Sequence, residues 1–402
     1  PEAGRLIVLI EAMQRGFSVN EVAEMTKIDP FYFEQINKMR LLMHEIAAHP
    51  NKEPILQKAK SYGLSNQLIA RLWNTTPEQV YQMSIDHQLL TKYKEIEPSA
   101  GEFDQHTNSF YSAYEEENEI SRTSQPSALV IGTGGLRLGL SNSGDYFVAM
   151  MLKELHNEGF NNVIVNSNPS SVTFDPELAE KRYVEPATIE NILQILRIEQ
   201  PQYLFIPTSY DKLLKSLQNY DLDVKIIVIP DELPTTAASS DKQRYFFNYV
   251  YDGNYAYPLG TMTDLFSPIA LNYQSTALRY PADLPSSTYQ NLNDQASVAV
   301  LKMEQPGLYQ VIFEENDGEF NLMKVQPLSL PEVSFLSKAL HISLPGIFTQ
   351  LFTGKFDKML EPKPVSGIVN YRATFPFKAL RVKGGIPARN RVIGAQMQFL
   401  GE

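Results

Sequence analysis

Residues 127–169 read SALVIGTGGLRLGLSNSGDYFVAMMLKELHNEGFNNVIVNSNP, and this stretch decides the fold class. An apolar run ending in glycine is followed by an amphipathic segment of helical length and then by a second apolar run. Two similar units follow, because ATIENILQILRIEQ leads into QYLFIPT and LLKSLQNYDL leads into VKIIVIP. Strand–helix alternation at this spacing predicts an α/β fold with a parallel, doubly wound sheet.

Two loops are expected at the edge of this sheet where the carboxyl ends of the strands meet, which is where such sheets bind ligands. They are residues 132–139 and 166–169. The first loop, GTGGLRLG, lacks the dinucleotide fingerprint because Arg137 occupies its third glycine position, and Leu140 stands where a P-loop needs lysine. Backbone amides after a strand can still hold an anion. An anion site and a tight turn that only lets the helix pack are equally supported; the candidate ligand-binding residues are Gly132, Gly134, Gly135, Arg137, Gly139, Asn166 and Asn168.

The first 92 residues or so are predicted to be helical. Ser18 and Glu21 form a capping-box pattern, and Asp29-Pro30 and Thr76-Pro77 each place a capping oxygen before a proline. The pattern GFSVNEVA followed by Pro30 recurs as GLSNQLIA followed by Pro77, with equal spacing. We therefore expect two packed copies of a helix–turn–helix-like unit, which together form an interaction module.

The same unit could be taken for a DNA-binding helix–turn–helix. Its recognition helix would begin with Phe31, Tyr32, Phe33 and Glu34, whereas bases and phosphates favour Arg, Lys, Asn or Gln at these positions. The whole chain is acidic, since 35 Lys+Arg against 46 Asp+Glu give 35 − 46 = −11. We expect no nucleic-acid partner.

The rest of the chain divides around the parallel sheet. Residues 93–124 are rich in acidic side chains and are predicted to be a solvated linker. Residues 240–402 are predicted to be α+β, with a helix from Leu284 to about Met303 and hairpins that turn at Asp252-Gly253 and Asn316-Asp317-Gly318. The predicted domains are therefore residues 1–124, 125–232 and 233–402.

Composition excludes several classes of function. With 43% hydrophobic and 20% charged residues, the chain of 402 residues has the composition of a soluble globular protein. It has no cysteine, which excludes disulfides, thiolate catalysis and cysteine-ligated metals, and its six histidines show no metal-binding spacing. No run approaches the ~18 apolar residues of a membrane span. We expect a cytoplasmic protein without a metal site, and, because Pro1 rather than Met opens the chain, a piece of a longer one.

Read in order, these segments resemble the large subunit of carbamoyl phosphate synthetase. GFSVNEV with KIDPFY resembles its oligomerisation domain, and EF with YSAYEEE resembles the stretch leading out of that domain. IGTGGLRLG followed by GDY, and NSNP followed by VTFD and RYVEP, resemble the domain that precedes the ATP-grasp fold in the second synthetase half. Weaker resemblance to the ATP-grasp domain itself follows, in the segments YDG, PLGTM, GLYQVIF, FLSK and FPFK, with Gly385 and Arg389.

This resemblance implies an all-helical oligomerisation domain, a pre-ATP-grasp domain and a remnant of an ATP-grasp domain. It also implies the family's chemistry, the ATP- and magnesium-dependent formation of carbamoyl phosphate from bicarbonate and ammonia or glutamine, for pyrimidine or arginine biosynthesis.

Two departures oppose that chemistry. First, only the short stretch IPDELPTTAASSDKQRYFF stands where the family has an ATP-binding lid.

Second, the family's metal- and phosphate-binding positions are changed. Lys324 and Gln326 replace the carboxylate and amide that hold magnesium, and Leu328 replaces a phosphate-binding arginine. Pro331, Glu332 and Ile312 replace an arginine, a threonine and a glutamine. Magnesium needs carboxylate oxygens, and two unit charges of like sign at ~4 Å repel by about 4 kcal/mol at an effective dielectric near 20. We therefore expect no catalytic residues, no bound cofactor and no ATP turnover.

Three hypotheses remain. The leading one is a catalytically inactive relative that acts as an oligomerisation, regulatory or scaffold subunit, as a homo-oligomer or in complex with other synthetase subunits. The second is a part of a working synthetase whose competent ATP site lies outside this segment. The third is a small-anion sensor at the glycine loop, with Arg137 as its charged contact.

Overall fold

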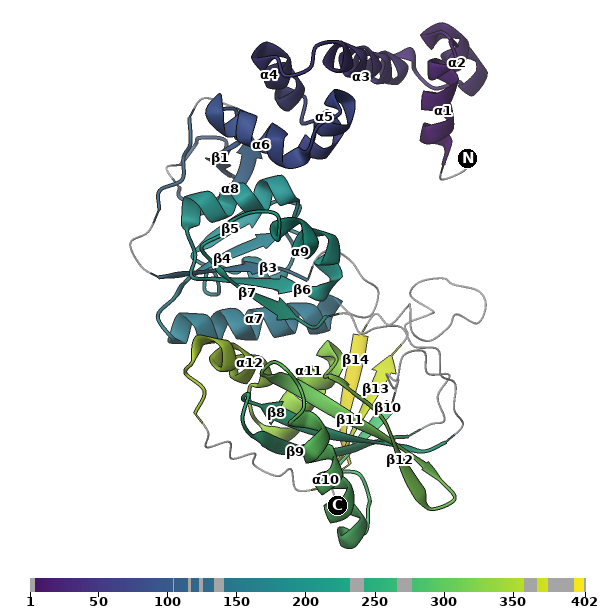
Figure 1. Ribbon diagram of the computed structural model, residues 1–402, viewed down its shortest axis with the longest axis vertical. Coiled ribbons are helices and arrows are strands. Elements are labelled where there is room, and N and C mark those ends of the chain that lie inside the picture. Colours follow the sequence, from purple (N-terminus) through teal and green to yellow (C-terminus); the bar gives the residue numbers. More distant parts are fainter. Residues whose placement is uncertain are drawn as a thin grey trace. The chain divides into compact units, whose positions relative to one another are not determined.

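The computed structural model describes residues 4–103, 105–114, 117–122, 126–133, 141–231, 242–265, 277–357, 367–374 and 394–400. The chain forms two compact units (Figure 1). The helical unit comprises Pro1–Tyr93 and Ser112–Glu119, and the sheet unit comprises Lys94–Tyr111 and Ile120–Glu402.

The helical unit contains the two copies of a helix–turn–helix-like unit that the sequence repeat predicts, each preceded by a further helix. The helices are α1 (Arg5–Gln14), α2 (Val19–Thr26), α3 (Pro30–Ala48), α4 (Glu53–Ser61), α5 (Asn66–Trp73) and α6 (Pro77–Asp86). The predicted caps are confirmed: Ser18 and Glu21 form a capping box at α2, and Asp29 and Thr76 cap α3 and α6.

The two copies share a glycine turn and a pair of buried positions in the helix that follows it. Gly16 and Gly63, which precede α2 and α5, both have positive φ, +102° and +73°. Val22 and Ala23 are buried in the first copy, as are their counterparts Ile69 and Ala70 in the second. The same local signals therefore fold the chain twice.

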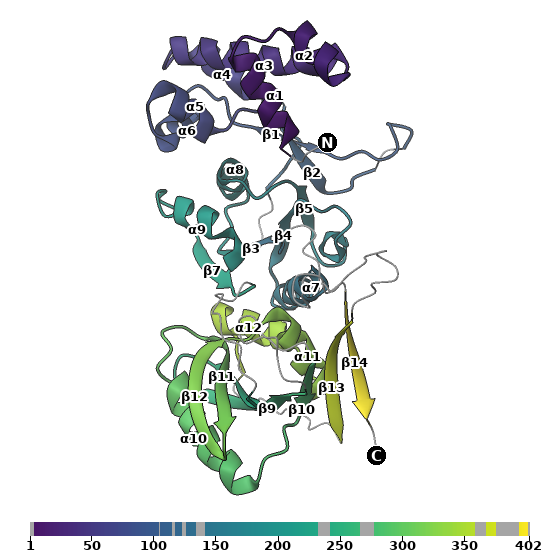
Figure 2. The same ribbon diagram turned by 90° about the vertical axis from the view of Figure 1, so that its right-hand side faces the viewer.

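The first sheet of the sheet unit has seven strands in the order β1-β2-β5-β4-β3-β6-β7. From β2 to β7 every pair in this order is parallel, so the predicted parallel sheet is confirmed. Helix α7 (Ser141–Asn157) lies on one face, and α8 (Ile189–Glu199) and α9 (Asp211–Leu217) lie on the other (Figures 1 and 2). The strands are β1 (Lys92–Glu95), β2 (Ser109–Ala113), β3 (Ser127–Ile131), β4 (Asn161–Asn166), β5 (Lys181–Val184), β6 (Tyr203–Pro207) and β7 (Lys225–Ile229).

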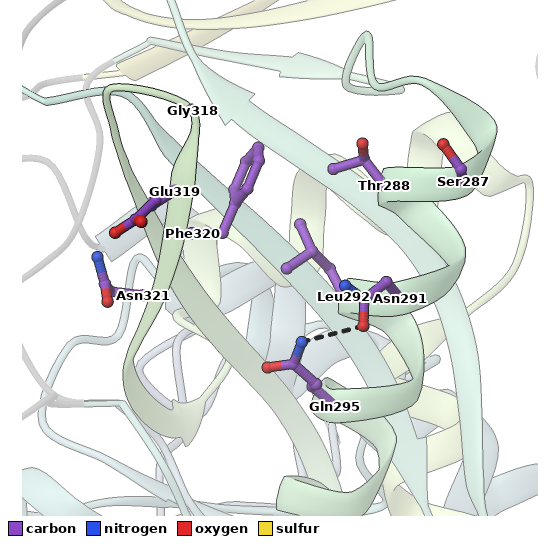
Figure 3. Close-up of a pocket in the computed structure, with 9 residues that line it drawn as sticks. All are labelled: Ser287, Thr288, Asn291, Leu292, Gln295, Gly318, Glu319, Phe320 and Asn321. Atoms are coloured by element: carbon purple, nitrogen blue, oxygen red, sulfur yellow. Dashed lines mark hydrogen bonds between the residues drawn. The ribbon is translucent and has the colours of Figure 1, made fainter.

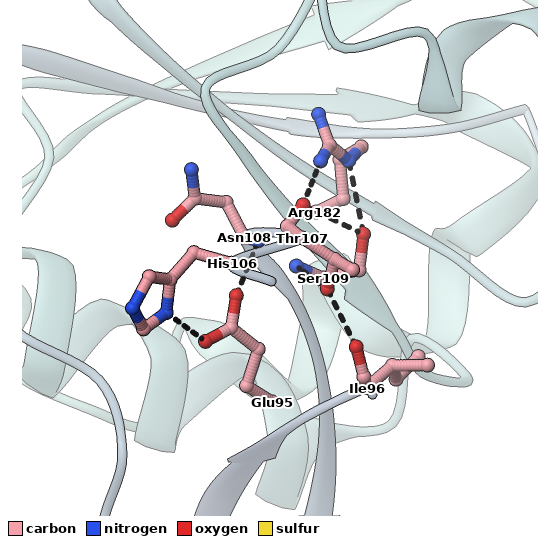
Figure 4. A network of polar contacts seen from close by, with 7 residues as sticks. All are labelled: Glu95, Ile96, His106, Thr107, Asn108, Ser109 and Arg182. Carbon is pink, nitrogen blue, oxygen red and sulfur yellow. Dashed lines mark hydrogen bonds and ion pairs between the residues drawn. The ribbon is translucent and has the colours of Figure 1, made fainter. Parts of the chain in front are cut away.

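The prediction that residues 93–124 are only a solvated linker is wrong, because this segment supplies β1 and β2. The Arg182 guanidinium donates to the carbonyl of Thr107 and to Ser109 Oγ, and Glu95 accepts from the Asn108 amide at 2.6 Å and lies 3.1 Å from His106 Nδ1 (Figure 4). The acidic side chain that suggested solvation is thus part of a network that holds the segment to the sheet.

An antiparallel sheet follows, with strand order β12-β11-β8-β9-β10-β13-β14. Helix α10 (Ser286–Val300) covers one face, and α11 (Leu330–Leu340) and α12 (Leu344–Thr353) pack on the other. Both predicted hairpins and the predicted helix are confirmed. The strands are β8 (Arg244–Tyr251), β9 (Ala256–Asp264), β10 (Ala277–Tyr280), β11 (Gly307–Asn316), β12 (Glu319–Pro327), β13 (Ile368–Thr374) and β14 (Gly394–Leu400).

One hydrophobic core joins the two sheets of the sheet unit through α7, α11 and α12. The rings of Phe147 and Phe348 meet edge-on with centroids 5.4 Å apart, and Gln350 Nε2 donates to Glu154 Oε1 at 2.6 Å. None of the helices in the described residues is long and apolar enough to cross a membrane.

Candidate functional site

Strands β11 and β12 bring together the positions that the resemblance assigns to metal and phosphate binding. Ile312 pairs with Lys324 across the two strands, and Gln310 pairs with Gln326. Leu328 directly follows β12 and is buried, with its amide donating to the Leu308 carbonyl at 2.9 Å. Ile312 and Leu328 belong to the core beneath α11 and α12. The face of β11 and β12 that packs against α11 and α12 therefore presents apolar groups, a neutral amide and one ammonium group.

A row of buried carboxamides crosses three strands on this face. Gln310 Nε2 donates to Asn248 Oδ1 at 3.1 Å, and Gln326 Nε2 donates to Gln310 Oε1 at 3.5 Å. The three residues are cross-strand neighbours on β8, β11 and β12. Carboxamides are neutral, so this row supplies no negative charge to a magnesium ion.

The carboxyl groups near this row are already engaged. Asp264 lies 2.7 Å from the Arg244 guanidinium, and both side chains are almost fully buried. Glu332 Oε2 accepts from the amide and hydroxyl of Ser329 at 3.0 and 2.7 Å. Burial raises the pKa of Glu332, and its contacts with Ser329 and Gln310 oppose part of that rise. Neither group offers an ionised, accessible carboxylate.

Sequence reasoning identified Glu332 only as a departure from the family, and it missed the Arg244–Asp264 pair. Arg244 stands in β8 and Asp264 in β9, and the pairing of these two strands, rather than any local motif, brings them together. Pro331 lies in the first turn of α11, where its fixed φ suits a helix start. Among the described residues, no group of three or more His, Asp or Glu side chains could hold a metal ion.

The described ends of the two predicted ligand loops lie at the carboxyl edge of the parallel sheet, directly after β3 and β4. Gly132, which follows β3, lies so close to β4 that an added Cβ would stand 2.5 Å from Asn166 Nδ2. Asn166 Oδ1 accepts from the Asn168 amide at 3.0 Å, and Asn168 Oδ1 accepts from the Ser170 amide at 3.1 Å. The structure thus brings Gly132 and Asn166 together and uses both asparagines to shape the turn. Gly134, Gly135, Arg137 and Gly139 lie outside the described residues, and the anion site stays a prediction.

A half-buried acid that the sequence did not single out as a site residue lies at the same edge. Asp145, in the first turns of α7, accepts from Ser171 Oγ at 2.9 Å. Burial raises the pKa of Asp145, and the bond from Ser171 opposes that rise. A further close approach is at Gly144, where an added Cβ would stand 2.4 Å from Thr133 Oγ1. Helix α7 is thereby held tightly to the end of β3.

A polar pocket of about 580 Å³ opens between α10 and the β11–β12 hairpin (Figure 3). Gln295 and Asn291 share a hydrogen bond of 3.2 Å on its helical wall, and Phe320 and Glu319 lie across from them. No lysine, arginine or histidine is among its lining residues, so the pocket does not suit a nucleoside triphosphate. Its lining is Ser287, Thr288, Asn291, Leu292, Gln295, Gly318, Glu319, Phe320 and Asn321.

The helical unit contains an apolar groove of about 350 Å³ between α1, α3 and α5. Three methionines line it, and methionine side chains adapt to varied partner surfaces. Arg40 and His44 are its basic lining residues. The sequence predicted an interaction module but not this groove, which is lined by Leu6, Ile10, Met13, Gln14, Ile36, Met39, Arg40, Met43, His44, Ala47 and Leu72.

Solved structures that the chain resembles include carboxylases, at low identity. It is 13% identical to the Kluyveromyces lactis urea carboxylase, with 63% of this chain and 24% of that chain covered and a TM-score of 0.45. The Rhizobium etli pyruvate carboxylase gives 11% identity over 61% of this chain and 30% of that one, with a TM-score of 0.44. The Campylobacter jejuni biotin carboxylase is 10% identical over 61% of this chain and 75% of that one, with a TM-score of 0.45.

Two family models match the chain in succession. Residues 1–88 match the carbamoyl-phosphate synthetase large chain oligomerisation domain, and residues 124–228 match the carbamoyl phosphate synthase preATP-grasp domain. They coincide with α1–α6 of the helical unit and with β3–β7 of the parallel sheet. The chain therefore carries the oligomerisation domain of the carbamoyl-phosphate synthetase large chain, followed by the preATP-grasp domain of that synthetase.

Proposed function

We propose that this chain is a catalytically inactive relative of the synthetase large chain, and that it acts through its helical unit by self-association or by docking on a catalytic synthetase. We further propose domains at residues 1–124, 125–232 and 233–402, the last a reduced ATP-grasp-like domain. The observation that supports the proposal is the chemistry of Lys324 and Gln326 on β12 and of the buried Leu328 directly after it, at the positions that the resemblance assigns to metal and phosphate binding.

The physical argument concerns charge. Phosphoryl transfer depends on metal ions and cationic clamps for nearly all of its rate. Here an ammonium group, whose Nζ is shut off from solvent, stands where a metal-binding carboxylate is expected. The nearby Asp264 is neutralised by Arg244, and burial favours the neutral form of Glu332. These groups repel a divalent cation or fail to bind it.

An assay of ADP release from Mg-ATP, with bicarbonate and ammonia present, tests this proposal. We expect no release above the blank for the native chain. The variant with Lys324→Glu, Gln326→Asn and Leu328→Arg restores the expected ligands, and binding of Mg-ATP by that variant alone would support the assignment of these positions. ADP release by the native chain that Leu328→Ala abolishes would contradict it.

A second candidate function is that the chain is part of a working synthetase whose competent ATP site lies elsewhere. The observation that favours it is the order of the two matched domains, residues 1–88 and then 124–228, along one chain. A mixture reconstituted with the other synthetase parts would then make carbamoyl phosphate only when this chain is present. Equal production without it would rule this candidate out.

A further inference from the structure

Helix α10 has an uncommon composition for a helix that faces solvent. Its 15 residues, SSTYQNLNDQASVAV, include one charged residue, Asp294, although 20% of the whole chain is charged. Surface helices normally place charged side chains on their solvent face. From Ser286 to Gln295 the other exposed positions hold only serine, asparagine and glutamine. Serine and asparagine favour a helix less than lysine or glutamate does, so helix stability does not account for this choice of residues.

Three of these polar residues face the β11–β12 hairpin. Ser287, Asn291 and Gln295 are spaced four residues apart, so they lie on the same side of the helix, and all three line the pocket of about 580 Å³ (Figure 3). Leu292 and Phe320 also line it, and both pack on the aromatic core beneath α10. The pocket therefore combines a polar wall with an apolar floor that the core holds in place.

The polar wall keeps hydrogen-bonding groups that the protein does not use. Gln295 Nε2 donates to Asn291 Oδ1 at 3.2 Å. Within the described part of the chain, no partner accepts from Asn291 Nδ2 and none donates to Gln295 Oε1. The hydroxyl groups of Ser287 and Thr288, each of which can donate and accept, lie on the same wall. A donor and an acceptor are thus open next to each other.

The charge of the lining excludes most other classes of ligand. Because lysine, arginine and histidine are absent from it, a phosphate or carboxylate group would meet no positive charge there. The one charged lining residue is Glu319, whose carboxylate can accept from hydroxyl groups. Hydroxyl groups both donate and accept, so they match a wall of adjacent donors and acceptors. The C–H face of a sugar ring suits an apolar floor.

We propose that this pocket binds a small neutral ligand with vicinal hydroxyl groups, either a free monosaccharide or the ribose of an uncharged nucleoside. Asn291 Nδ2 donates to one hydroxyl group and Gln295 Oε1 accepts from the next, while the ring lies over Leu292 and Phe320. The volume of about 580 Å³ is within the range of small-molecule sites.

This pocket is separate from the positions on which the proposed function rests. Phe320 packs on the core beneath α10. Lys324 pairs with Ile312, which belongs to the core beneath α11 and α12 on the opposite face of the sheet. The inference therefore goes beyond the proposed function, and either can fail without the other.

Saturation-transfer NMR of the full chain with D-ribose, D-glucose and adenosine, each added separately, tests this inference. We expect transfer to at least one of the three probes at millimolar concentration, and inorganic phosphate should not reduce it. Transfer to glucose and ribose alike would identify a free monosaccharide as the ligand, and transfer to adenosine without glucose would identify the ribose of a nucleoside. Transfer to none of the probes, or its loss on adding phosphate, would overturn the proposal.

Alanine variants assign the binding to this wall. Asn291→Ala and Gln295→Ala should each weaken binding several-fold through the loss of one hydrogen bond. Both variants should unfold at the native temperature or above it, because alanine favours a helix more than either residue and a bond between two exposed carboxamides contributes little. The matched control is Gln290→Ala, which removes the bond of 2.9 Å to Asp294 outside the pocket and should leave binding unchanged.

Two further outcomes would contradict the proposal. Binding that survives both pocket variants, or that Gln290→Ala weakens equally, would place the ligand elsewhere. Glu319→Gln should keep most of the binding, because a carboxamide oxygen still accepts from a hydroxyl group. Complete loss of binding in this variant would show that the pocket takes a cation rather than a neutral ligand.

Discussion

At the scale of single residues, burial of the Glu332 carboxyl beside the antiparallel sheet makes the stability of the protein depend on pH. The pKa of Glu332 is raised from its ordinary value of 4.5 by burial. Below pH 4.5 the carboxyl is protonated in both the folded and the unfolded chain. As the pH rises above 4.5, the unfolded chain ionises first, so the free energy of unfolding falls until the pH passes the folded pKa.

Glu332→Gln is therefore expected to stabilise the protein at pH 8 and to flatten the fall in stability between pH 5 and pH 8. Glutamine can keep the capping box with Ser329, since its carbonyl oxygen accepts the same bond. Urea unfolding at the two pH values checks this. A Gln variant that is less stable at pH 8, or that keeps the native pH trend, would show that Glu332 is ionised in the folded state.

Gly132 is expected to tolerate no side chain. A Cβ there would stand 2.5 Å from Asn166 Nδ2, and Asn166 is buried and hydrogen-bonded. Gly132→Ala should lower the free energy of unfolding by about 1–3 kcal/mol through overpacking. Gly4→Ala is the control, because nothing lies within 4 Å of its added Cβ. Equal unfolding midpoints for the two variants would contradict this close approach.

At the scale of elements, strand β5 holds the segment that the sequence alone presents as a linker. Lys181 Nζ donates to the Ser121 carbonyl at 2.6 Å and lies 2.9 Å from Glu199, which also accepts from the Tyr183 hydroxyl. The side chains of Lys181 and Glu199 are almost fully buried. Removing one partner of such a pair leaves a buried charge without its counter-ion.

Lys181→Met should therefore destabilise the sheet unit by about 3–5 kcal/mol and speed tryptic cleavage after Arg122, which is next to Ser121. Adding Glu199→Gln should recover part of the loss. The exposed pair Lys215–Asp211 is the control, and Lys215→Ala should change stability by less than about 1 kcal/mol. Unchanged cleavage after Arg122 in the Lys181 variant would mean that the segment is held by other contacts.

The sequence predicts elements well where the signal is local. The capping box of Ser18 and Glu21 and the turn at Asp252-Gly253 each lie within a few residues, and both are confirmed. Strands β1, β2 and β5 have only four or five residues each, and non-local contacts such as Arg182 to Thr107 stabilise them. The Arg244–Asp264 pair and the row from Asn248 to Gln326 depend on strand register, which no local pattern specifies.

At the scale of the whole molecule, we propose an interaction module joined to a sheet unit that has no phosphate chemistry. The apolar groove lies in the helical unit. The sheet unit keeps a continuous core, while apolar and neutral groups occupy most of the expected metal and phosphate positions. Selection for folding and association alone would produce this combination.

Calorimetric titration of the intact chain with Mg-ATP tests this account most directly. We expect no binding heat up to millimolar nucleotide, because an ammonium group at Lys324 and neutral carboxamides are poor ligands for the metal that the triphosphate carries. Micromolar binding would contradict it, and would mean that the C-terminal sheet retains a nucleotide site and that the chain works as a catalytic part of a synthetase.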